Sequence, residues 1–381
     1  MIYLDNAATT KVCREASEAA CYAMTEVFGN PSSLHRLGIE AEKLVRFSSE
    51  IISRALGSQP SEIIFTSGAT ESSNLAIFGL AENYGRRKKR IVTTSIEHPS
   101  VLEPMKKLAE RGFELKIVEP DENGEITEEA LVSAVDGGTC LISAMLVNNE
   151  TGYILPIERA FSRIKKLYPD CMTHCDCVQG FMKLPVKAKA LSADAISLSG
   201  HKIHAPKGIG ALWIKKGVRV APTVFGGGQQ GGIRSGTEAV PSIYAFAKAV
   251  EALMLTLSER FEHACGLRDY AVKRLSEAGA IINSKSGGSP YILSVSLPCI
   301  KSETLLHFLE SRDIFVSSGS ACSRGKKSGV LRAFGLSDGI IDSTVRISTS
   351  AETSKGDIDA LAEAFNEASA TLVKTSNIRR I

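Results

Sequence analysis

The sequence has no uninterrupted apolar run of the roughly 20 residues that a membrane-spanning helix requires. Its first five residues, Met1 to Asp5, also lack the basic stretch followed by an apolar stretch that marks a secretion signal. We therefore expect a cytoplasmic protein with no membrane partner.

Charge of one sign is not in excess either, because 45 lysines and arginines stand against 42 aspartates and glutamates. Such a balance creates no global field that would attract nucleic acid or an acidic membrane. One basic run, at residues 86–90, lies between a helical and a strand-like stretch, and we interpret it as a solvated turn. We expect small molecules or other proteins as partners, with no direct nucleic-acid contact.

Nine cysteines are present, and without a secretion signal we expect most of them to be reduced thiols. Cys171, Cys175 and Cys177 surround His174, which raises the alternative of a zinc site. In a strand, however, Cys175 and Cys177 point away from Asp176, and Cys171 is too distant to complete a ligand set. We therefore predict packing residues and no metal. The same packing role is expected of Cys13, Cys21, Cys140, Cys265 and Cys299.

The length of 381 residues exceeds the size at which one hydrophobic core stops growing, which favours a large and a smaller domain. From residue 60 onward, short apolar runs alternate with amphipathic stretches, a pattern typical of a mostly parallel sheet covered by helices. The expected strands are 62–66, 90–94, 114–118, 140–146, 172–175, 195–198 and 210–214. The expected helices between them are 69–84, 100–111, 127–134 and 157–167.

A long helical region over residues 238–278 is expected to lead out of this domain. Shorter elements follow at 292–297, 302–311, 314–317, 344–348 and 354–373. We therefore predict an α/β fold with a mostly parallel seven-stranded sheet in a large domain, residues 15–255. A small α+β domain is predicted from both chain ends, residues 1–14 and 256–381.

Residues that carry chemistry lie at the ends of predicted strands. Ser67-Gly68-Ala69-Thr70 stands between a strand and a helix, where backbone N–H groups offer a seat for a phosphate, although plain helix capping gives the same pattern. Lys202 follows the strand 195–198, where burial would lower its pKa and make it a Schiff-base nucleophile. Asp176 ends another strand and would keep a pyridinium nitrogen protonated, unless it only caps the next turn.

Short motifs occur in order along the whole chain: LDNAATT at 4–10, GNPSS at 29–33, FTSGATE at 65–71, EH at 97–98, NNETG at 148–152, SGHK at 199–202, GGGQ at 226–229, RSGTE at 234–238, SSGSACS at 317–323 and VRIS at 345–348. This ordered set resembles the NifS/IscS-type cysteine desulfurases. These are class V enzymes of fold type I that depend on pyridoxal 5′-phosphate (PLP), so the resemblance implies that fold and that cofactor.

Carried over by position, the resemblance implies that Lys202 holds PLP, that Asp176 contacts its ring nitrogen, and that His98 stacks on the ring and moves protons. Asn149 and Gln179 would contact the ring hydroxyl. Arg346 would grip the substrate carboxylate, with Asn149 beside it. The implied phosphate ligands are Ala69, Thr70, Ser199 and His201, together with Thr237, which would reach the cofactor of a neighbouring subunit and so implies a homodimer.

Cys322 lies in a stretch rich in serine and glycine, which indicates an exposed loop. Nearby Arg324, Lys326 and Lys327 would favour its thiolate form, although an incidental loop cysteine fits the composition as well. The resemblance implies that Cys322 takes the sulfur of L-cysteine as a persulfide and releases L-alanine. The sulfur would then pass to an acceptor protein, such as an iron–sulfur cluster assembly scaffold or a thiolation protein.

Two alternatives stay open at this point. One is a selenocysteine lyase or another class V PLP enzyme, although Cys322 argues against an aminotransferase. The other is a sulfur-relay scaffold with little turnover of its own.

Overall fold

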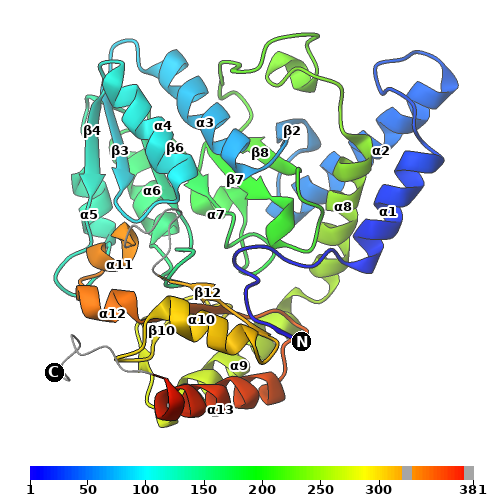
Figure 1. The fold of residues 1–381 in the computed structure, drawn as a ribbon. Coiled ribbons are helices and arrows are strands. Elements are labelled where there is room, and N and C mark those ends of the chain that lie inside the picture. Colours follow the sequence, from blue (N-terminus) through cyan, green and yellow to red (C-terminus); the bar gives the residue numbers. More distant parts are fainter. Residues whose placement is uncertain (320–327, 373–381) are drawn as a thin grey trace.

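A computed structural model describes residues 1–319 and 328–372 of the chain (Figure 1). Its central feature is a seven-stranded sheet with the order β2-β8-β7-β6-β5-β3-β4. The strands pair in parallel except for β8, which is antiparallel to both of its neighbours. The predicted α/β fold and mostly parallel sheet are therefore confirmed. The strands are β2 (Ile63–Thr66), β3 (Arg90–Thr94), β4 (Glu114–Val118), β5 (Thr139–Met145), β6 (Met172–Asp176), β7 (Ala195–Ser199) and β8 (Gly210–Ile214).

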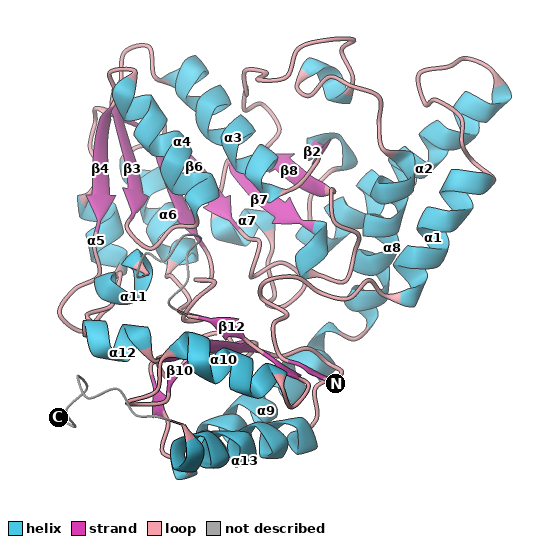
Figure 2. Ribbon diagram, in the orientation of Figure 1, coloured by secondary structure: helices cyan, strands magenta, loops and turns pink. Residues whose placement is uncertain are grey.

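Helices cover both faces of this sheet (Figure 2). Neighbouring strand residues alternate between the faces: Ile91 packs with α3 (Ala69–Tyr84) and α4 (Pro99–Glu110), whereas Val92 packs in the core of the opposite face. Burial on both sides explains why the strands are almost continuously apolar. The opposite face is covered by α5 (Glu128–Ser133), α6 (Ile157–Leu167) and α7 (Ala188–Leu191), and the same core includes residues of α2 (Arg36–Leu56) and α8 (Val240–Leu255).

Two features of the helices differ from the sequence prediction. The helices α1 (Arg14–Thr25) and α2, which pack against α8, were not predicted. The expected helical region over 238–278 is present but divided in two, because α8 and α9 (Leu257–Glu277) meet at Thr256 and are bent by 72°. No helix in the two described ranges is by itself long and apolar enough to cross a membrane, and only this bent pair passes when its halves are combined.

A second sheet, antiparallel and with the order β12-β13-β10-β9, lies below the first in Figure 1. It has its own apolar core with α9, α10 (Ser302–Glu310) and α13 (Lys355–Thr371). Its strands are β9 (Ile281–Ile282), β10 (Ile292–Ser296), β12 (Ser317–Ser318) and β13 (Thr344–Ser348), and two short helices, α11 (Gly329–Ala333) and α12 (Asp338–Asp342), precede β13.

The first residues of the chain lie between the two sheets. β1 (Ile2–Tyr3) pairs in parallel with β11 (Ile314–Phe315), and the N–H of Ser348 donates to the Leu4 carbonyl over 2.7 Å. Further on, the N–H of Thr10 donates to the carbonyl of His201 over 2.9 Å. The N-terminal segment thus runs from the second sheet to the carboxyl end of β7.

The cysteines follow the packing prediction in part. Cys140, Cys171, Cys175 and Cys177 are buried, and the His174 ring lies between the hydroxyls of Ser143 and Ser197. The prediction is wrong for Cys21, which is exposed on α1, because the sequence did not reveal which face of that helix is covered. Cys13, Cys265 and Cys299 are only half-buried.

Candidate active site

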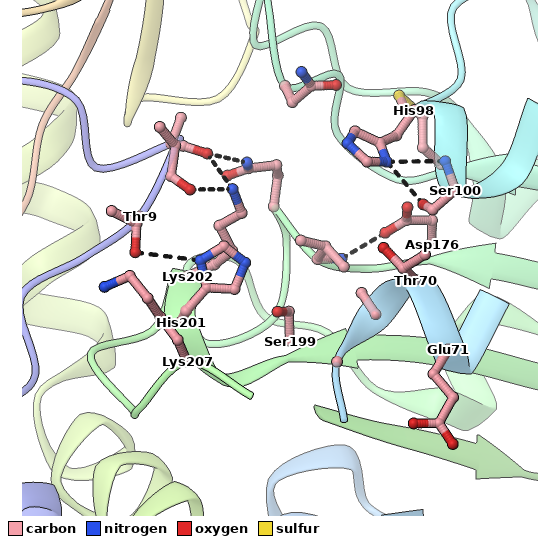
Figure 3. Close-up of a pocket in the computed structure, with 18 of the residues that line it drawn as sticks. Thr9, Thr70, Glu71, His98, Ser100, Asp176, Ser199, His201, Lys202 and Lys207 are labelled. Carbon is pink, nitrogen blue, oxygen red and sulfur yellow. Dashed lines mark hydrogen bonds between the residues drawn. The ribbon is translucent and has the colours of Figure 1, made fainter. Parts of the chain in front are cut away.

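A cavity of about 680 Å³ opens where β5, β6 and β7 end (Figure 3). Carboxyl ends of parallel strands are where α/β sheets bind ligands, and the volume suits a cofactor-sized molecule. Its lining includes the following predicted site residues: Ala69, Thr70, His98, Asn149, Asp176, Gln179, Ser199, His201, Lys202 and Arg346.

Lys202 ends a short turn, Gly200–Lys202, that follows β7. Its Nζ atom donates to the carbonyl oxygens of Ala7 and Ala8, each 2.6 Å away. Burial, aided by the nearby positive charge of Arg346, lowers the pKa of Lys202 to about 8. An amine with this pKa is partly neutral near pH 7, and the neutral form is the nucleophile that a Schiff base requires.

Asp176 is the last residue of β6, and its Oδ1 accepts a hydrogen bond from the Val178 N–H at 2.9 Å. Burial raises the pKa of Asp176 to about 6, and the positive charge of Lys202 only partly opposes this. No cation in the described part of the chain forms an ion pair with this carboxylate. A positively charged ring nitrogen would supply the missing partner.

His98 caps the N-terminus of α4, where its Nδ1 accepts the Ser100 N–H over 3.1 Å. The Ser100 hydroxyl lies 2.8 Å from the same nitrogen. Burial, followed by the charge of Lys202, lowers the pKa of His98, so the ring is neutral. With Nδ1 accepting, the proton of the neutral ring is on Nε2.

The phosphate seat was predicted at the turn before α3. Gly68 has a φ of 155°, and a Cβ atom there would meet nothing within 4 Å. Gly210 is required for a different reason, because its Cβ would approach the Cα of Gly68 to 2.7 Å. The first N–H groups of α3 have no acceptor within the helix, and Ala69 and Thr70 of this first turn line the cavity.

His201 and Ser199 approach this seat from the end of β7. Burial and the charge of Lys202 lower the pKa of His201 to about 4, so its ring is neutral and can donate a hydrogen bond. Exposed Lys207 also lines the cavity and adds a positive charge that sequence analysis did not assign.

Gln179 is almost fully buried, and both ends of its amide are used. Its Nε2 donates to the Ala7 carbonyl over 2.9 Å, and its Oε1 accepts from Lys183 at 2.8 Å. One N–H of the amide is still available to a ligand. Asn149 lines the cavity as well, and its own carbonyl accepts from Arg346 over 3.0 Å.

Arg346 lies in β13 of the second sheet and reaches the cavity from below. Its Nη2 donates to Asp5 Oδ1 over 2.9 Å, whereas its buried Nε has no partner among the described residues. Other residues of the chain therefore hold the guanidinium in place, but not all of its N–H groups have a hydrogen-bond acceptor. Sequence analysis assigned no role to Asp5 or to the carbonyls of Ala7 and Ala8. Backbone acceptors leave no signature in a sequence, and the partner of Asp5 is 341 residues away.

One predicted residue does not join this group, and one cannot be placed. Thr237 is exposed and does not line the cavity, so its predicted contact with a neighbouring subunit stays a prediction. Cys322 lies outside the described residues. The described residues on either side are fixed: Gly319 donates from its N–H to the Thr344 carbonyl, and the Ser328 hydroxyl donates to Glu150 over 2.5 Å.

This chain belongs to the class-V aminotransferase family, which it matches over residues 2–361. Within that family, it is 38% identical over 376 residues to a cysteine desulfurase of Trichormus azollae, covering 96% of this chain and 92% of the relative. The structure of a NifS-like protein superposes with a TM-score of 0.92 at 39% identity, covering 97% of this chain and all of the other. That of SspA in complex with cysteine gives 0.82 at 32% identity, covering 93% and 100%.

The residues of the cavity fit the PLP that these enzymes use. The open turn before α3 suits the cofactor's phosphate, and Lys202, with a pKa of about 8, suits its aldehyde. The carboxylate of Asp176, which has no ion-pair partner among the described residues, suits its ring nitrogen. These three features lie on the rim of the same cavity.

Proposed function

We propose that this protein is a PLP-dependent cysteine desulfurase, which removes sulfur from L-cysteine, leaves L-alanine and passes the sulfur to an acceptor protein. The observation that carries the proposal is that Lys202, Asp176 and Arg346 line one cavity. Lys202 and Asp176 follow or end strands of the first sheet, and Arg346 belongs to the second. Lys202 supplies the covalent link to PLP, Asp176 the partner of its ring nitrogen, and Arg346 the donors for the substrate carboxylate.

Bound PLP supplies an electron sink that stabilises negative charge on the substrate's α-carbon. The chain's own residues hold and move the protons. Asp176 keeps the ring nitrogen protonated, since its carboxylate gains a partner in doing so. Lys202, once its nitrogen is free, accepts the α-proton at Nζ, and the neutral His98 can donate the proton on its Nε2.

Arg346 orients the substrate by its carboxylate, for which a guanidinium offers two parallel donors. To do so, its guanidinium releases the Asp5 carboxylate and binds the substrate carboxylate instead. Its hydrogen bond to the backbone carbonyl of Asn149 keeps the side chain in place. The amino group of cysteine then lies toward Lys202, which lines the same cavity.

Cys322 is the group that we propose to take the sulfur. Its thiolate bonds to the sulfur of the substrate as the carbon–sulfur bond breaks, and the carbon fragment takes up a proton and leaves as L-alanine. The hydrogen bonds of Gly319 to β13, the strand that carries Arg346, and of Ser328 to Glu150, next to Asn149 of the cavity, support this role.

The test is to incubate the purified holoenzyme with L-cysteine and a thiol reductant, and to measure alanine and sulfide together. We expect equal amounts of both, with no keto acid. A protein that releases alanine only from selenocysteine would be a lyase for that substrate. A protein that releases no alanine at all would be a relay scaffold.

We further propose a cytoplasmic homodimer. Exposed apolar side chains cluster along α1 and the loop after it, namely Tyr22, Met24, Phe28 and Leu34, which supports burial against a second copy. The reduced state of the described cysteines supports a reducing compartment. We propose an iron–sulfur scaffold or a thiolation protein as the sulfur acceptor.

We propose domain limits of 15–255 for the large domain and of 1–14 with 256–381 for the small one. The apolar core of each sheet supports these limits, since most of its residues lie within them.

A further inference from the structure

A second, much smaller cavity touches Lys202 from a different set of neighbours. Among the hydrogen-bond donors that line it are Lys183, Arg260, Tyr291 and Thr349, which we call the buried donor cluster. They come from separate elements, since Lys183 follows β6, Arg260 lies in α9, and the other two flank β10 and β13. The space measures about 10 Å³, which is room for one particle of roughly the size of a water molecule.

Three of the four donors are buried without a hydrogen-bond partner. The atoms are Nη1 of Arg260, the hydroxyl of Tyr291 and Oγ1 of Thr349. Tyr291 is only 3% exposed, so water outside the protein does not reach it freely. A buried donor without a partner costs about 1–3 kcal/mol, which makes three of them around one cavity a strong sign of a missing acceptor.

The charged side chains that line the cavity, Lys183, Lys202 and Arg260, are all basic. Lys183 is 7% exposed, and the charged groups that act on it are Lys202, Arg260 and Arg346. With burial, these cations lower the pKa of Lys183 to about 7. Arg260 forms no ion pair with any residue of the described ranges, and burial lowers its pKa as well.

No carboxylate of the described residues acts on Lys183 or Arg260, and Asp176 acts on Lys202 instead. Asp5 is paired with Arg346, and Glu352 acts on His204 at the edge of the cavity rather than on Lys183 or Arg260. A water molecule would satisfy some of the donors but would leave the positive charge uncompensated. An anion accepts from every donor and neutralises charge in the same place.

We propose that the buried donor cluster binds a single monovalent inorganic anion, of which chloride is the one available in most solutions. Arg260 and Lys183 supply the charge, and the hydroxyls of Tyr291 and Thr349 complete the set of donors. The site is separate from the phosphate seat at α3, with which it shares none of its donors.

The anion also acts on the catalytic cavity, because Lys202 lines both spaces. Among nearby charges, the positive charge of Arg346 lowers the pKa of Lys202 most. A negative charge in the second cavity opposes this effect. The anion therefore raises that pKa and adjusts how much of the amine is protonated at neutral pH.

The direct test is a crystal of the holoenzyme grown in sodium bromide, with data collected at the bromine absorption edge. We expect one anomalous peak among Arg260, Tyr291 and Thr349. An ordinary water peak there without anomalous signal, in a crystal that shows bromide elsewhere, would overturn the proposal.

A solution test uses thermal unfolding of the holoenzyme in chloride and in gluconate at equal ionic strength. Chloride should raise the melting temperature of the wild type. Tyr291→Phe removes one donor to the anion with little change of shape, and the chloride midpoint should rise about tenfold or more. Tyr270→Phe is the matched control, because the Tyr270 hydroxyl instead donates to Asp359 over 2.7 Å. An unchanged midpoint in Tyr291→Phe would contradict the site.

Discussion

Nη2 of Arg346 lies 2.9 Å from Oδ1 of Asp5. Asp5 comes from the N-terminal segment and Arg346 from β13, so the ion pair joins opposite ends of the sequence. A carboxylate of the chain thus occupies the guanidinium that we propose for the carboxylate of cysteine. Substrate binding is then an exchange of carboxylates, and the affinity reflects only the difference between the two.

Asp5→Asn should therefore tighten substrate binding. Asparagine keeps the shape but removes the competing charge, so the substrate no longer has to displace an ion pair. We expect the KM for cysteine to fall by roughly fivefold, corresponding to about 1 kcal/mol. Steady-state kinetics would reveal it, and a KM that rises instead would mean that Asp5 orients Arg346 rather than competing for it.

Arg346→Lys should do the opposite. Lysine keeps the charge but loses the two-point grip, so KM for cysteine should rise by roughly tenfold to a hundredfold while PLP affinity stays the same. Arg312→Lys is a suitable control, because Arg312 pairs with Glu367 far from the cavity. Equal KM values in the two variants would refute the assignment of Arg346.

Lys202→Ala should lose the covalent cofactor linkage. After borohydride reduction and proteolysis, the wild type should carry PLP on the peptide containing Lys202, and the variant should carry none. Lys207→Ala is the matched control, since Lys207 lines the same cavity but is exposed. A labelled peptide other than that of Lys202 in the wild type would assign the linkage elsewhere.

Cys322→Ser should stop sulfur transfer but not cofactor binding. Serine cannot carry a persulfide, so alanine release should fall by more than about a hundredfold while the visible absorption of bound PLP stays the same. Cys21→Ser provides the control, since Cys21 is an exposed thiol on α1. Near-normal turnover in the Cys322 variant would direct the search to other thiols.

Glu97 offers a test of stability against pH. Its Oε1 accepts from the Thr94 hydroxyl and the Met145 N–H, and burial raises its pKa from 4.5 to about 8. A carboxyl whose pKa is higher when folded stabilises the protein fully below its unfolded pKa, and this stabilisation is lost as the pH rises toward 8.

Glu97→Gln keeps the neutral shape at every pH. The free energy of unfolding of the wild type should therefore fall relative to the variant between about pH 4.5 and pH 8, by a few kcal/mol in total. Denaturant unfolding at several pH values measures this difference. Parallel curves for the two proteins would show that Glu97 is ionised in the folded state.

Much of the fold could be predicted because buried strands are apolar runs of characteristic length. Each of the seven central strands was located to within about two residues at its ends. The bend at Thr256 was missed because both flanking segments favour helix, and only tertiary packing separates them.

The candidate site, too, could be predicted from the sequence only in part. Lys202 and Asp176 were found because strand ends mark them in the sequence. Sequence analysis gave no indication of the Ala7 and Ala8 carbonyls on Lys202, or of the unpaired donors at Tyr291 and Thr349. Such contacts depend on which distant segments meet, and no local pattern records that.

The parallel pairing of Ile2 with Ile314 limits the order in which parts of the chain can assemble during synthesis. A ribosome releases the N-terminal segment early, yet the strand that receives it emerges only after more than four-fifths of the chain has been made. Until then the N-terminal segment is held from the side of the main sheet alone, by Thr10 on the His201 carbonyl and by Gln179 on the Ala7 carbonyl. We therefore expect nascent chains that stop short of β11 to hold the main sheet but to lack the second anchor of this segment, so the Ala7 and Ala8 acceptors of Lys202 reach their final positions last.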